Sequence, residues 1–348
     1  MTRKSKVKHM ERIKFDQAEL YQIYQNWPQH FNAAQNISCK IDRESSYYDS
    51  VIMCGMGASG TVCDILNDLI ERSGTIPSMS LSGKIIPSYI NKHTLVIINS
   101  VSGDTLEAIL AMKQAINKNA EVICISSGGR LKESCLEYGS KHITVPKLSH
   151  SRASFPYLLM PGLKLIDNFL TRSLSNEILL LADNLSEVFN DITSSLPYES
   201  NIAKQLASFT NNSLVFCLTS PSFISVGTRF KNSLNENSKV HCISESILEA
   251  SHNEIVPFTY DSKNIHRKVL LLSWSYDIEI TKQRLRKVKS LLEKLGHPVF
   301  EIKSPHESLI NSLVCSIYLL DISTIYLAAL RKIDPSRTPA IDILKETG

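Results

Sequence analysis

Residues 55–60, GMGASG, follow four apolar residues and are the first stretch of the chain whose spacing could hold a ligand. The pattern matches G-x-G-x-x-G, the turn through which a dinucleotide-binding strand enters its helix. That fingerprint also needs a carboxylate about twenty residues later, which binds the ribose hydroxyls. Residues 76–84, IPSMSLSGK, contain no carboxylate, and Glu71 comes too early, inside the expected helix. The sequence therefore argues against a nicotinamide or flavin cofactor.

Hydroxyl groups are what this turn and the next one offer instead. Ser59 lies in the first turn, and the stretch NSVSGDT adds Ser100, Ser102 and Thr105 in the second. A phosphate is bound by hydroxyls and backbone N–H groups at the positive end of a helix, where glycine lets the backbone approach closely. Each turn alone could be an ordinary helix cap, because Ser, Thr and Asp are favoured there. As a pair they favour a phosphate monoester, with Gly57 as a further ligand.

The elements that position these turns are predicted from alternating apolar runs and helical periodicity. Four apolar runs are typical of buried parallel strands; they span 50–54, 94–99, 121–126 and 142–146. Apolar residues at 62, 65, 66, 69 and 70 predict a helix after the first strand, and a second helix begins at Thr105. Both turns therefore lie at strand C-termini, where open α/β sheets bind their ligands.

The second half of the chain repeats this theme after a helical stretch. From 155 to about 195 the pattern is helical, and we expect Pro161 to break or start a helix. Strands are predicted over 213–219, 239–244, 269–274 and 299–303. A helix from about 280 to 295 ends at Gly296 with Lys and Arg on its outer face, and a long apolar helix covers 309–329.

The fold class is therefore α/β, with two α/β/α sandwich domains that have mainly parallel sheets and are joined by a helical segment. The expected parts are an N-terminal extension and helix at 1–40, a first domain at 41–155 with the phosphate-binding turns, a helical connection at 156–195, and a second domain at 196–348.

Composition limits the classes of partner. The chain has 348 residues, 43% of them hydrophobic and 21% charged, with a formal net charge of +4. The only strong basic cluster is the N-terminal tail, so we expect no nucleic-acid partner. Because no uninterrupted apolar run approaches about eighteen residues, we expect no membrane span and a cytoplasmic protein.

The eight cysteines contain no CxxC pair, which argues against a clustered zinc site. Cys54, Cys124, Cys217 and Cys242 lie inside apolar runs, where a reduced thiol behaves as a small core side chain. We expect a reducing compartment and no metal.

Several motifs together resemble a known family. GMGASG, SVSGDT and ISSGGRL (125–131) resemble the sugar isomerase (SIS) domain, in which serine and threonine turns bind the phosphate of a phosphosugar. SRASFPYL (151–158) resembles the arginine motif of the bifunctional phosphoglucose/phosphomannose isomerases. Three later segments continue that resemblance in order: RFKNSLNENSKV (229–240), SHNEIVPF (251–258) and DPSRTPAIDILK (334–345).

The resemblance implies an enzyme that interconverts glucose 6-phosphate with fructose 6-phosphate through a cis-enediol, without a metal or organic cofactor. Mannose 6-phosphate is the second candidate substrate. Glu236 matches the family's base, which carries a proton between C1 and C2. His252 matches the histidine that opens the sugar ring. Arg152 matches the arginine that stabilises enediolate charge. Lys345 resembles the lysine that reaches the ring oxygen beside the histidine.

Two further positions carry supporting roles in the same resemblance. Glu254 could orient the ring or simply cap a turn. Thr338 is the candidate for the small threonine that is linked to tolerance of both configurations at C2, and so to mannose activity.

The match departs from the family pattern at several positions. Ala58 stands in place of a glycine, Asp104 of an asparagine and Val101 of an aromatic residue, while Ala108 removes a hydroxyl and Pro257 replaces a glycine. A carboxylate beside a phosphate is repulsive unless it points away or caps the following helix.

Two functions therefore stay open, an isomerase and a phosphosugar-binding sensor or regulator that has lost turnover. The presence of Glu236, His252, Arg152 and Lys345 together favours the enzyme, because a sensor needs no base. Ala58 and Asp104, which stand where the family has a glycine and an asparagine, favour the phosphosugar-binding sensor or regulator. Relatives complete their active site across a dimer, with the histidine donated by the neighbouring subunit, so the resemblance implies a homodimer.

Overall fold

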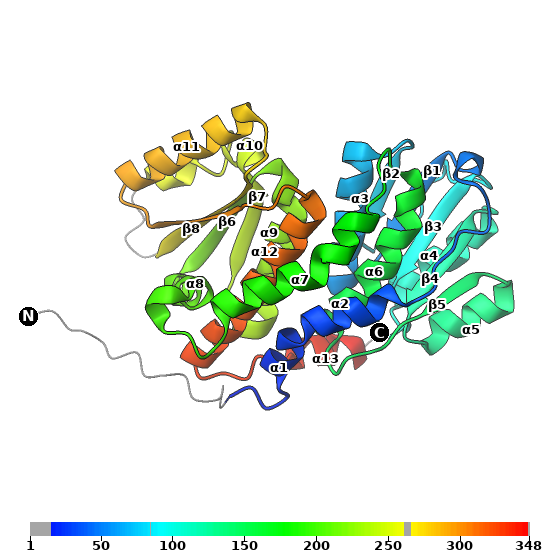
Figure 1. The fold of residues 1–348 in the computed structure, drawn as a ribbon, viewed down its shortest axis with the longest axis horizontal. Helices are drawn as coiled ribbons and strands as arrows, with labels where there is room; N and C mark the ends of the chain where they lie inside the picture. The colour runs from blue at the N-terminus through cyan, green and yellow to red at the C-terminus, as the bar shows by residue number, and fades with distance from the viewer. Residues whose placement is uncertain (1–14, 84, 261–265, 347–348) are drawn as a thin grey trace, which may run out of the picture. The chain divides into compact units, whose positions relative to one another are not determined.

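The computed structural model describes residues 15–83, 85–260 and 266–346, so the basic tail noted in the sequence lies outside the described residues. The chain divides into two compact units (Figure 1). The N-terminal unit is Asn26–Ala182, and the C-terminal unit combines Met1–Gln25 with Asp183–Gly348. Each is built on a sheet of parallel strands, which confirms the predicted α/β class.

The sheet of the N-terminal unit has five parallel strands in the order β2-β1-β3-β4-β5. They are β1 (Ser50–Cys54), β2 (Ser78–Leu81), β3 (Thr94–Asn99), β4 (Glu121–Ser126) and β5 (Lys141–Thr144). Four of them confirm the predicted strands. The fifth, β2, was missed because its sequence SMSL lacks an apolar run, as suits a short strand at the edge of a sheet.

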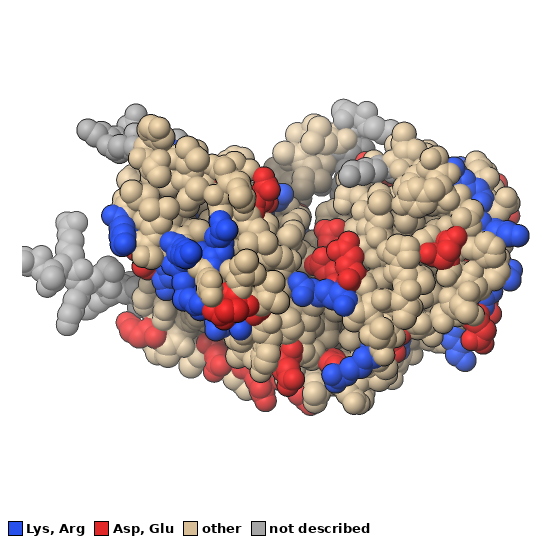
Figure 2. Space-filling view, turned by 90° about the horizontal axis from the view of Figure 1, so that it is seen from above, with Lys and Arg blue, Asp and Glu red and all other residues tan. Residues whose placement is uncertain are grey.

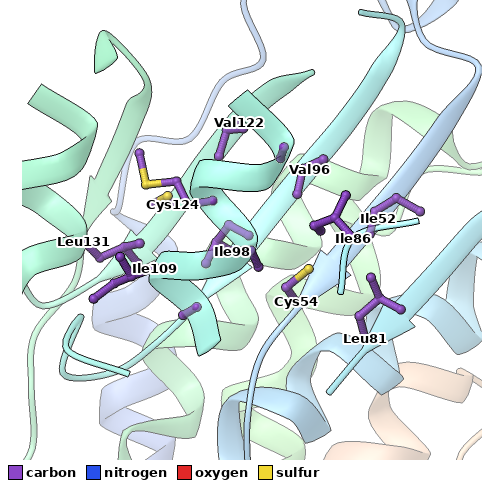
Figure 3. Packing of buried hydrophobic residues seen from close by; sticks show 14 of the residues in the cluster. Ile52, Cys54, Leu81, Ile86, Val96, Ile98, Ile109, Val122, Cys124 and Leu131 are labelled. Carbon is purple, nitrogen blue, oxygen red and sulfur yellow. The ribbon is translucent and has the colours of Figure 1, made fainter. Parts of the chain in front are cut away.

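The core of this unit follows from alternation of side chains along the strands. Ile52, Val96 and Cys124 point to the face covered by α4 (Leu106–Asn117) and α5 (Gly129–Tyr138), as Figure 3 shows. The intervening strand residues are buried toward the opposite face. The helices there are α2 (Trp27–Gln35), α3 (Ala58–Ser73) and α6 (Phe155–Ile166).

The prediction that Pro161 breaks or starts a helix is wrong, because α6 continues through it. A proline inside a helix costs about 3 kcal/mol, since a hydrogen bond is lost and its ring crowds the preceding turn. Every residue of α6 except Lys164 is buried, so packing of the whole helix outweighs that cost. The next residue, Gly162, allows close contact with α3, because a Cβ there would lie 2.5 Å from Leu66 Cδ1.

The sheet of the C-terminal unit has four parallel strands in the order β7-β6-β8-β9. They are β6 (Leu214–Thr219), β7 (Cys242–Ser246), β8 (Arg267–Trp274) and β9 (Val299–Ser304). The start predicted for β7, residue 239, is wrong by three positions. Lys239 has a left-handed backbone, with φ 54° and ψ 43°, which ends the preceding helical turn and delays the strand.

Helices cover both faces of this second sheet. One face carries α8 (Ile202–Thr210), α9 (Ile224–Ser233) and α12 (Leu309–Leu330). The other carries α10 (Ile247–Ala250) and α11 (Glu279–Lys294), which share a core cluster with Phe216 and Leu218 of β6. Two further helices of the unit are α1 (Leu20–Gln25) and α13 (Pro339–Glu346), and α7 (Ser175–Ile192) crosses the boundary between the units.

Two predicted helices of this unit are confirmed in character as well as position. The helix α11 buries Thr281, Leu285, Val288 and Leu292, and its Lys and Arg side chains gather on the outer surface seen in Figure 2. The helix α12 is long and apolar enough to cross a membrane, but 83% of its apolar window is buried inside the protein. It is therefore the core helix of its unit.

Candidate active site

The predicted phosphate turns flank one point in the N-terminal sheet. From β1 the chain passes through α3 to β2 on one side, whereas β3 pairs with β1 on the other side. Such a switch point opens a crevice at the carboxyl ends of the two strands, where α/β proteins bind their ligands. Gly57 and Ser59 follow β1, and the segment 100–105 follows β3. The structure therefore brings all five predicted phosphate residues to this edge.

Backbone geometry explains the glycines of the first turn. Gly57 has φ 56° and ψ −122°, a conformation that other residues rarely adopt. A Cβ on Gly55 would lie 2.7 Å from the carbonyl carbon of Ser59, so the turn needs glycine there to close. Ser59 is only 6% exposed, and its N–H donates to Met56 O at 3.1 Å. The turn is thus tight enough to present the first N–H groups of α3 toward the crevice.

The second turn is shaped by its own hydroxyls. Ser100 Oγ accepts the N–H of Gly103 at 3.1 Å and lies 3.0 Å from Thr105 Oγ1, while Ser102 Oγ accepts the N–H of Asp104 at 3.2 Å. The N-cap residues of α3 and α4, Gly57 and Thr105, make no side-chain capping bond to their helix. Two helix N-termini on neighbouring strands therefore keep N–H donors for an anion.

Asp104, the residue whose charge opposes a phosphate, is turned toward α5. Its Oδ1 accepts the backbone N–H of Arg130 at 3.0 Å, and the Arg130 guanidinium donates to Asp104 O at 2.9 Å. A Cβ on Gly129 would lie 2.6 Å from the same carboxylate oxygen, so this glycine makes room for it. Asp104 thus caps the N-terminus of α5 and not that of α4.

Two other departures from the family pattern are packing positions. Val101 is 4% exposed, and Ala108 belongs to the core cluster beneath α4. Their side chains therefore contribute to the core of the N-terminal unit.

A third turn, ISSGGRL, supports the second. Ser126 Oγ donates to Gly128 O at 2.9 Å and lies 2.7 Å from His142 Nε2. Burial lowers the pKa of His142. A Cβ on Gly103 would lie 1.9 Å from Gly128 O, so the second and third turns are in direct contact. Sequence reasoning did not assign a role to His142, because nothing in its own segment, HITVP, marks it.

A further hydroxyl at this edge also escaped the sequence analysis. A Cβ on Gly60, in the first turn of α3, would lie 3.3 Å from Ser82 Oγ. Ser82 directly follows β2, the strand that the apolar pattern did not predict. Identifying this serine would have required identifying its strand.

Arg152 belongs to the same unit. It lies in a 3-10 turn, Ser151–Ser154, that follows β5 and contacts α3, and it is 8% exposed. Trp27 Nε1 donates to Ala153 O at 3.0 Å, and Ser154 Oγ donates to His150 O at 3.4 Å. These bonds hold the turn, so the guanidinium is a permanently charged group on a rigid segment.

Glu236 lies in the C-terminal unit, on the π-helical turn η6 (Leu234–Ser238). Asn237 Nδ2 donates to Thr324 Oγ1 at 2.8 Å, and Ser238 Oγ donates to Thr324 O at 2.7 Å. Asn237 and Ser238 are fully buried, whereas Glu236 is half-buried. Single π turns inside helices are frequent at functional sites. The segment NENSK is therefore anchored to α12 through the two residues that follow Glu236.

A buried ion pair reinforces this anchor. Arg229 Nη2 lies 2.7 Å from Asp321 Oδ2, and both side chains are almost fully buried. Ser233 Oγ also donates to Asp321, and Arg229 Nη2 donates to Tyr24 OH at 3.3 Å. Burial alone would lower the pKa of Arg229, but Asp321, Tyr24 and Glu236 together raise it. The pair ties α9 to α12 directly below the turn that carries Glu236.

His252 lies in a different layer of the same unit. It is exposed, in the turn after α10, and its N–H donates to Glu249 O at 2.9 Å. The helix α10 packs on the face that α11 covers, whereas η6 packs against α12 on the opposite face. The sheet lies between these layers, so a single C-terminal unit does not bring His252 and Glu236 together. Glu254, two residues on, is half-buried in the same turn.

The remaining predicted residues belong to the last segment. Thr338 is half-buried just before α13, and its carbonyl accepts the N–H of Ile341 at 2.9 Å. Lys345 lies in α13, and its side chain is outside the described residues. Across the described ranges, no three His, Cys, Asp or Glu side chains come together as a possible metal site.

Residues 199–347 match the family of bacterial phospho-glucose isomerase C-terminal SIS domains. The C-terminal part of this chain is therefore similar to the SIS domains of that family. The matched residues include η6, the turn of His252 and α13, and so contain three of the four predicted catalytic residues.

Curated relatives extend the similarity to most of the chain. Seven of them, 24–29% identical, are bifunctional phosphoglucose/phosphomannose isomerases. The relative from Caldicellulosiruptor bescii is 29% identical over 94% of this chain and 96% of its own length. Another relative, a D-glucosamine-6-phosphate 4-epimerase from Sulfolobus acidocaldarius, is 24% identical over 70% of this chain and 74% of its own.

Solved structures support the fold. A glucosamine-6-phosphate deaminase from Thermotoga maritima superposes with a TM-score of 0.65 at 18% identity, over 92% of this chain and 96% of that one. At this identity the likeness shows a shared fold and not a shared substrate.

Proposed function

We propose that this protein is a phosphosugar isomerase that interconverts glucose 6-phosphate, and also mannose 6-phosphate, with fructose 6-phosphate through a cis-enediol. The observation that carries the proposal is the pair of helix N-termini at the switch point of the N-terminal sheet, whose N-cap residues make no side-chain capping bond. Seven relatives with that activity in their names support the isomerase class. The eight cysteines are free thiols, as expected of a cytoplasmic enzyme.

The phosphate group is the part of the substrate that the N-terminal unit holds. In the proposal it accepts hydrogen bonds from the hydroxyls of Ser59, Ser102 and Thr105 and from backbone N–H groups at the starts of α3 and α4. Ser100 shapes the second turn through its bond with the Gly103 N–H. Arg152, rigidly held in the same unit, supplies the positive charge for the oxyanion that develops during the reaction.

Proton transfer is assigned to the carboxylate of Glu236. In the open-chain aldose it removes the proton from C2, the C2–H electron pair forms the C1–C2 double bond, and the C1 carbonyl oxygen becomes an oxyanion. The proton of the C2 hydroxyl passes to this C1 oxygen, the C2–O bond becomes the new carbonyl, and Glu236 returns its proton to C1 to give the ketose. Glucose 6-phosphate and mannose 6-phosphate differ only at C2, so both give the same enediol. Before this step His252 and Lys345 open the sugar ring. One gives a proton to the ring oxygen as its bond to C1 breaks, and the other takes the proton of the C1 hydroxyl, which becomes the carbonyl.

The position of His252 leads to the proposed assembly. Because the sheet of the C-terminal unit separates it from Glu236, we propose that each active site takes Glu236 from one subunit and His252 from a second copy. Mixing Glu236→Gln with His252→Asn then restores about a quarter of wild-type activity, since half of the randomly paired dimers contain one intact site. If the mixture stays as inactive as each variant alone, the shared site is wrong.

The direct test is a coupled assay with glucose, mannose and fructose 6-phosphates, in which Glu236→Gln should lower kcat by about 10²–10⁴ with little change in KM. Solvent deuterium should appear at C2 with the wild type and not with the variant. Glucosamine 6-phosphate belongs in the same assay, because one relative is a 4-epimerase of that sugar.

A phosphosugar sensor is the alternative function. It predicts that wild type and Glu236→Gln bind fructose 6-phosphate equally while neither turns it over. The orientation of Asp104 toward α5 weakens the main argument for that alternative, because this carboxylate does not face the start of α4.

A further inference from the structure

Lys239 ends the turn that carries Glu236 and makes contacts far outside it. Its Nζ donates to Glu236 O at 2.7 Å and to Asp334 O at 3.0 Å. The carbonyls of Asn237 and Pro335 lie within 3.4 Å of the same nitrogen. One ammonium group therefore lies among four backbone carbonyls from two segments that are 95 residues apart.

The two pairs of carbonyls have different significance. Those of Glu236 and Asn237 belong to the end of η6, where helical carbonyls lack partners and a cation is favoured. A lysine that only capped its own turn would need no more than these. The bond to Asp334 serves another purpose, because it joins the turn to a distant loop. An ammonium has three N–H donors, enough to bond both segments at once.

The distant loop leads to other parts of the proposed site. Asp334 Oδ1 accepts the N–H and the O–H of Ser336, at 2.9 and 2.6 Å, so the loop has a defined shape of its own. It continues through Thr338 into α13, the helix of Lys345. Lys239 connects this preformed loop to the turn of Glu236.

We propose that Lys239 is a positioning residue, which locks the turn bearing Glu236 to the segment 334–338 through their backbone carbonyls. This inference rests on the proposed function only in naming Glu236 as the base. Its physical content is that the carboxylate is held in one orientation because its own peptide carbonyl is fixed. Small displacements of a catalytic group cost large factors in rate, so loss of this tie should lower turnover more than substrate affinity.

The test compares Lys239→Met with Lys239→Arg and with a matched control, Lys332→Met. Lys332 also has a left-handed backbone, with φ 58°, and an exposed side chain, so it controls for backbone strain and for charge. Lys239→Met should lower kcat for fructose 6-phosphate about 10- to 100-fold with KM changed less than about threefold. Lys239→Arg, which can still donate to carbonyls, should recover most of the loss, and the control should stay within about twofold of wild type.

Hydrogen exchange gives a readout that does not depend on activity. In Lys239→Met the backbone amides of residues 336–346 should exchange faster, while those of the N-terminal sheet keep wild-type rates. Unchanged exchange there, or a kcat within twofold of wild type, overturns the proposal. Should the Met variant not fold, Lys239→Gln replaces it in both measurements. If the wild type isomerises no sugar, the proposed function fails, and the exchange experiment still decides whether Lys239 ties the two segments.

Discussion

Four strands follow the same order in the two sheets, but the residues at the carboxyl ends of these strands have opposite chemistry. The order β2-β1-β3-β4 in the N-terminal unit matches β7-β6-β8-β9 in the C-terminal unit, so each sheet has a switch point between corresponding strands. The first edge carries glycine turns with hydroxyls and two uncapped helices. At the second edge Ser222 donates to the buried carboxylate of Asp277, which also accepts the N–H of Trp274 at 2.8 Å.

The two aspartates at these edges show how such a difference arises. Asp104 is exposed and faces the start of α5, outside the crevice between α3 and α4. Asp277 is 6% exposed, and its carboxylate takes up the hydroxyl that a ligand would otherwise use. A buried negative charge there repels a phosphate. The comparison teaches that topology creates the crevice twice, whereas the turn residues make only one of the two suited to an anion.

Gly103→Ala has the largest expected effect on the phosphate-binding edge of the N-terminal sheet. Its φ is +77°, and a Cβ would lie 1.9 Å from Gly128 O, so the second turn has to move away from the third. We expect fructose 6-phosphate binding to weaken about 100-fold and the free energy of unfolding to fall by about 2–4 kcal/mol. Titration calorimetry and denaturant unfolding measure the two effects.

Gly139→Ala is the matched control for that experiment. Gly139 has a similar φ of +67°, but no atom lies within 4 Å of the Cβ position. It should cost about 1 kcal/mol of stability and leave binding unchanged. Equal binding losses in the two variants would show that strain, and not the contact between turns, matters.

A matched pair of serines sharpens the comparison between the edges. Ser100→Ala removes the acceptor of the Gly103 N–H and should weaken fructose 6-phosphate and inorganic phosphate about tenfold each. Ser220→Ala acts at the carboxyl edge of the other sheet, directly after β6, where the hydroxyl is buried and has no partner among the described residues. It should change binding less than about twofold. A comparable loss in both variants would mean that the C-terminal edge also binds the phosphate.

The smallest expected effect concerns pH. Burial lowers the pKa of His142 below its ordinary 6.5, so the unfolded chain binds a proton more readily than the native state. This contribution to stability is present above pH 6.5 and is lost as the pH falls through the window below it. The Tm of the wild type falls between about pH 7 and pH 5, and in His142→Gln this fall should be smaller by about 2 °C.

His306 offers the control in the other unit, because burial lowers its pKa as well. His306→Gln should reduce the acid loss of stability in the same way. Only His142→Gln should also weaken phosphosugar binding at neutral pH, by about two- to threefold, because His142 supports the turn against which Gly103 packs. If both variants bind equally well, that support is unimportant.

Much of the fold and of the phosphate edge could be predicted because the signals are local. The apolar runs of β1, β3 and β4 and the turns at Gly57 and Thr105 depend on residues close together in the chain. The strand β2 was not predicted because an edge strand needs no apolar run. The break predicted at Pro161 was wrong because the burial of nearly all of α6 outweighs the local preference of proline.

The sequence by itself determined the strand pattern, the glycines that allow left-handed turns, and the hydroxyls at two strand ends, since all of these follow from backbone sterics within a few residues. Tertiary structure alone decided which way the carboxylate of Asp104 points, that the NENSK segment closes as a π turn on α12, and that Lys239 joins it to Asp334. These features depend on groups 26 to 95 residues apart, whose contact energies exist only once the chain has packed.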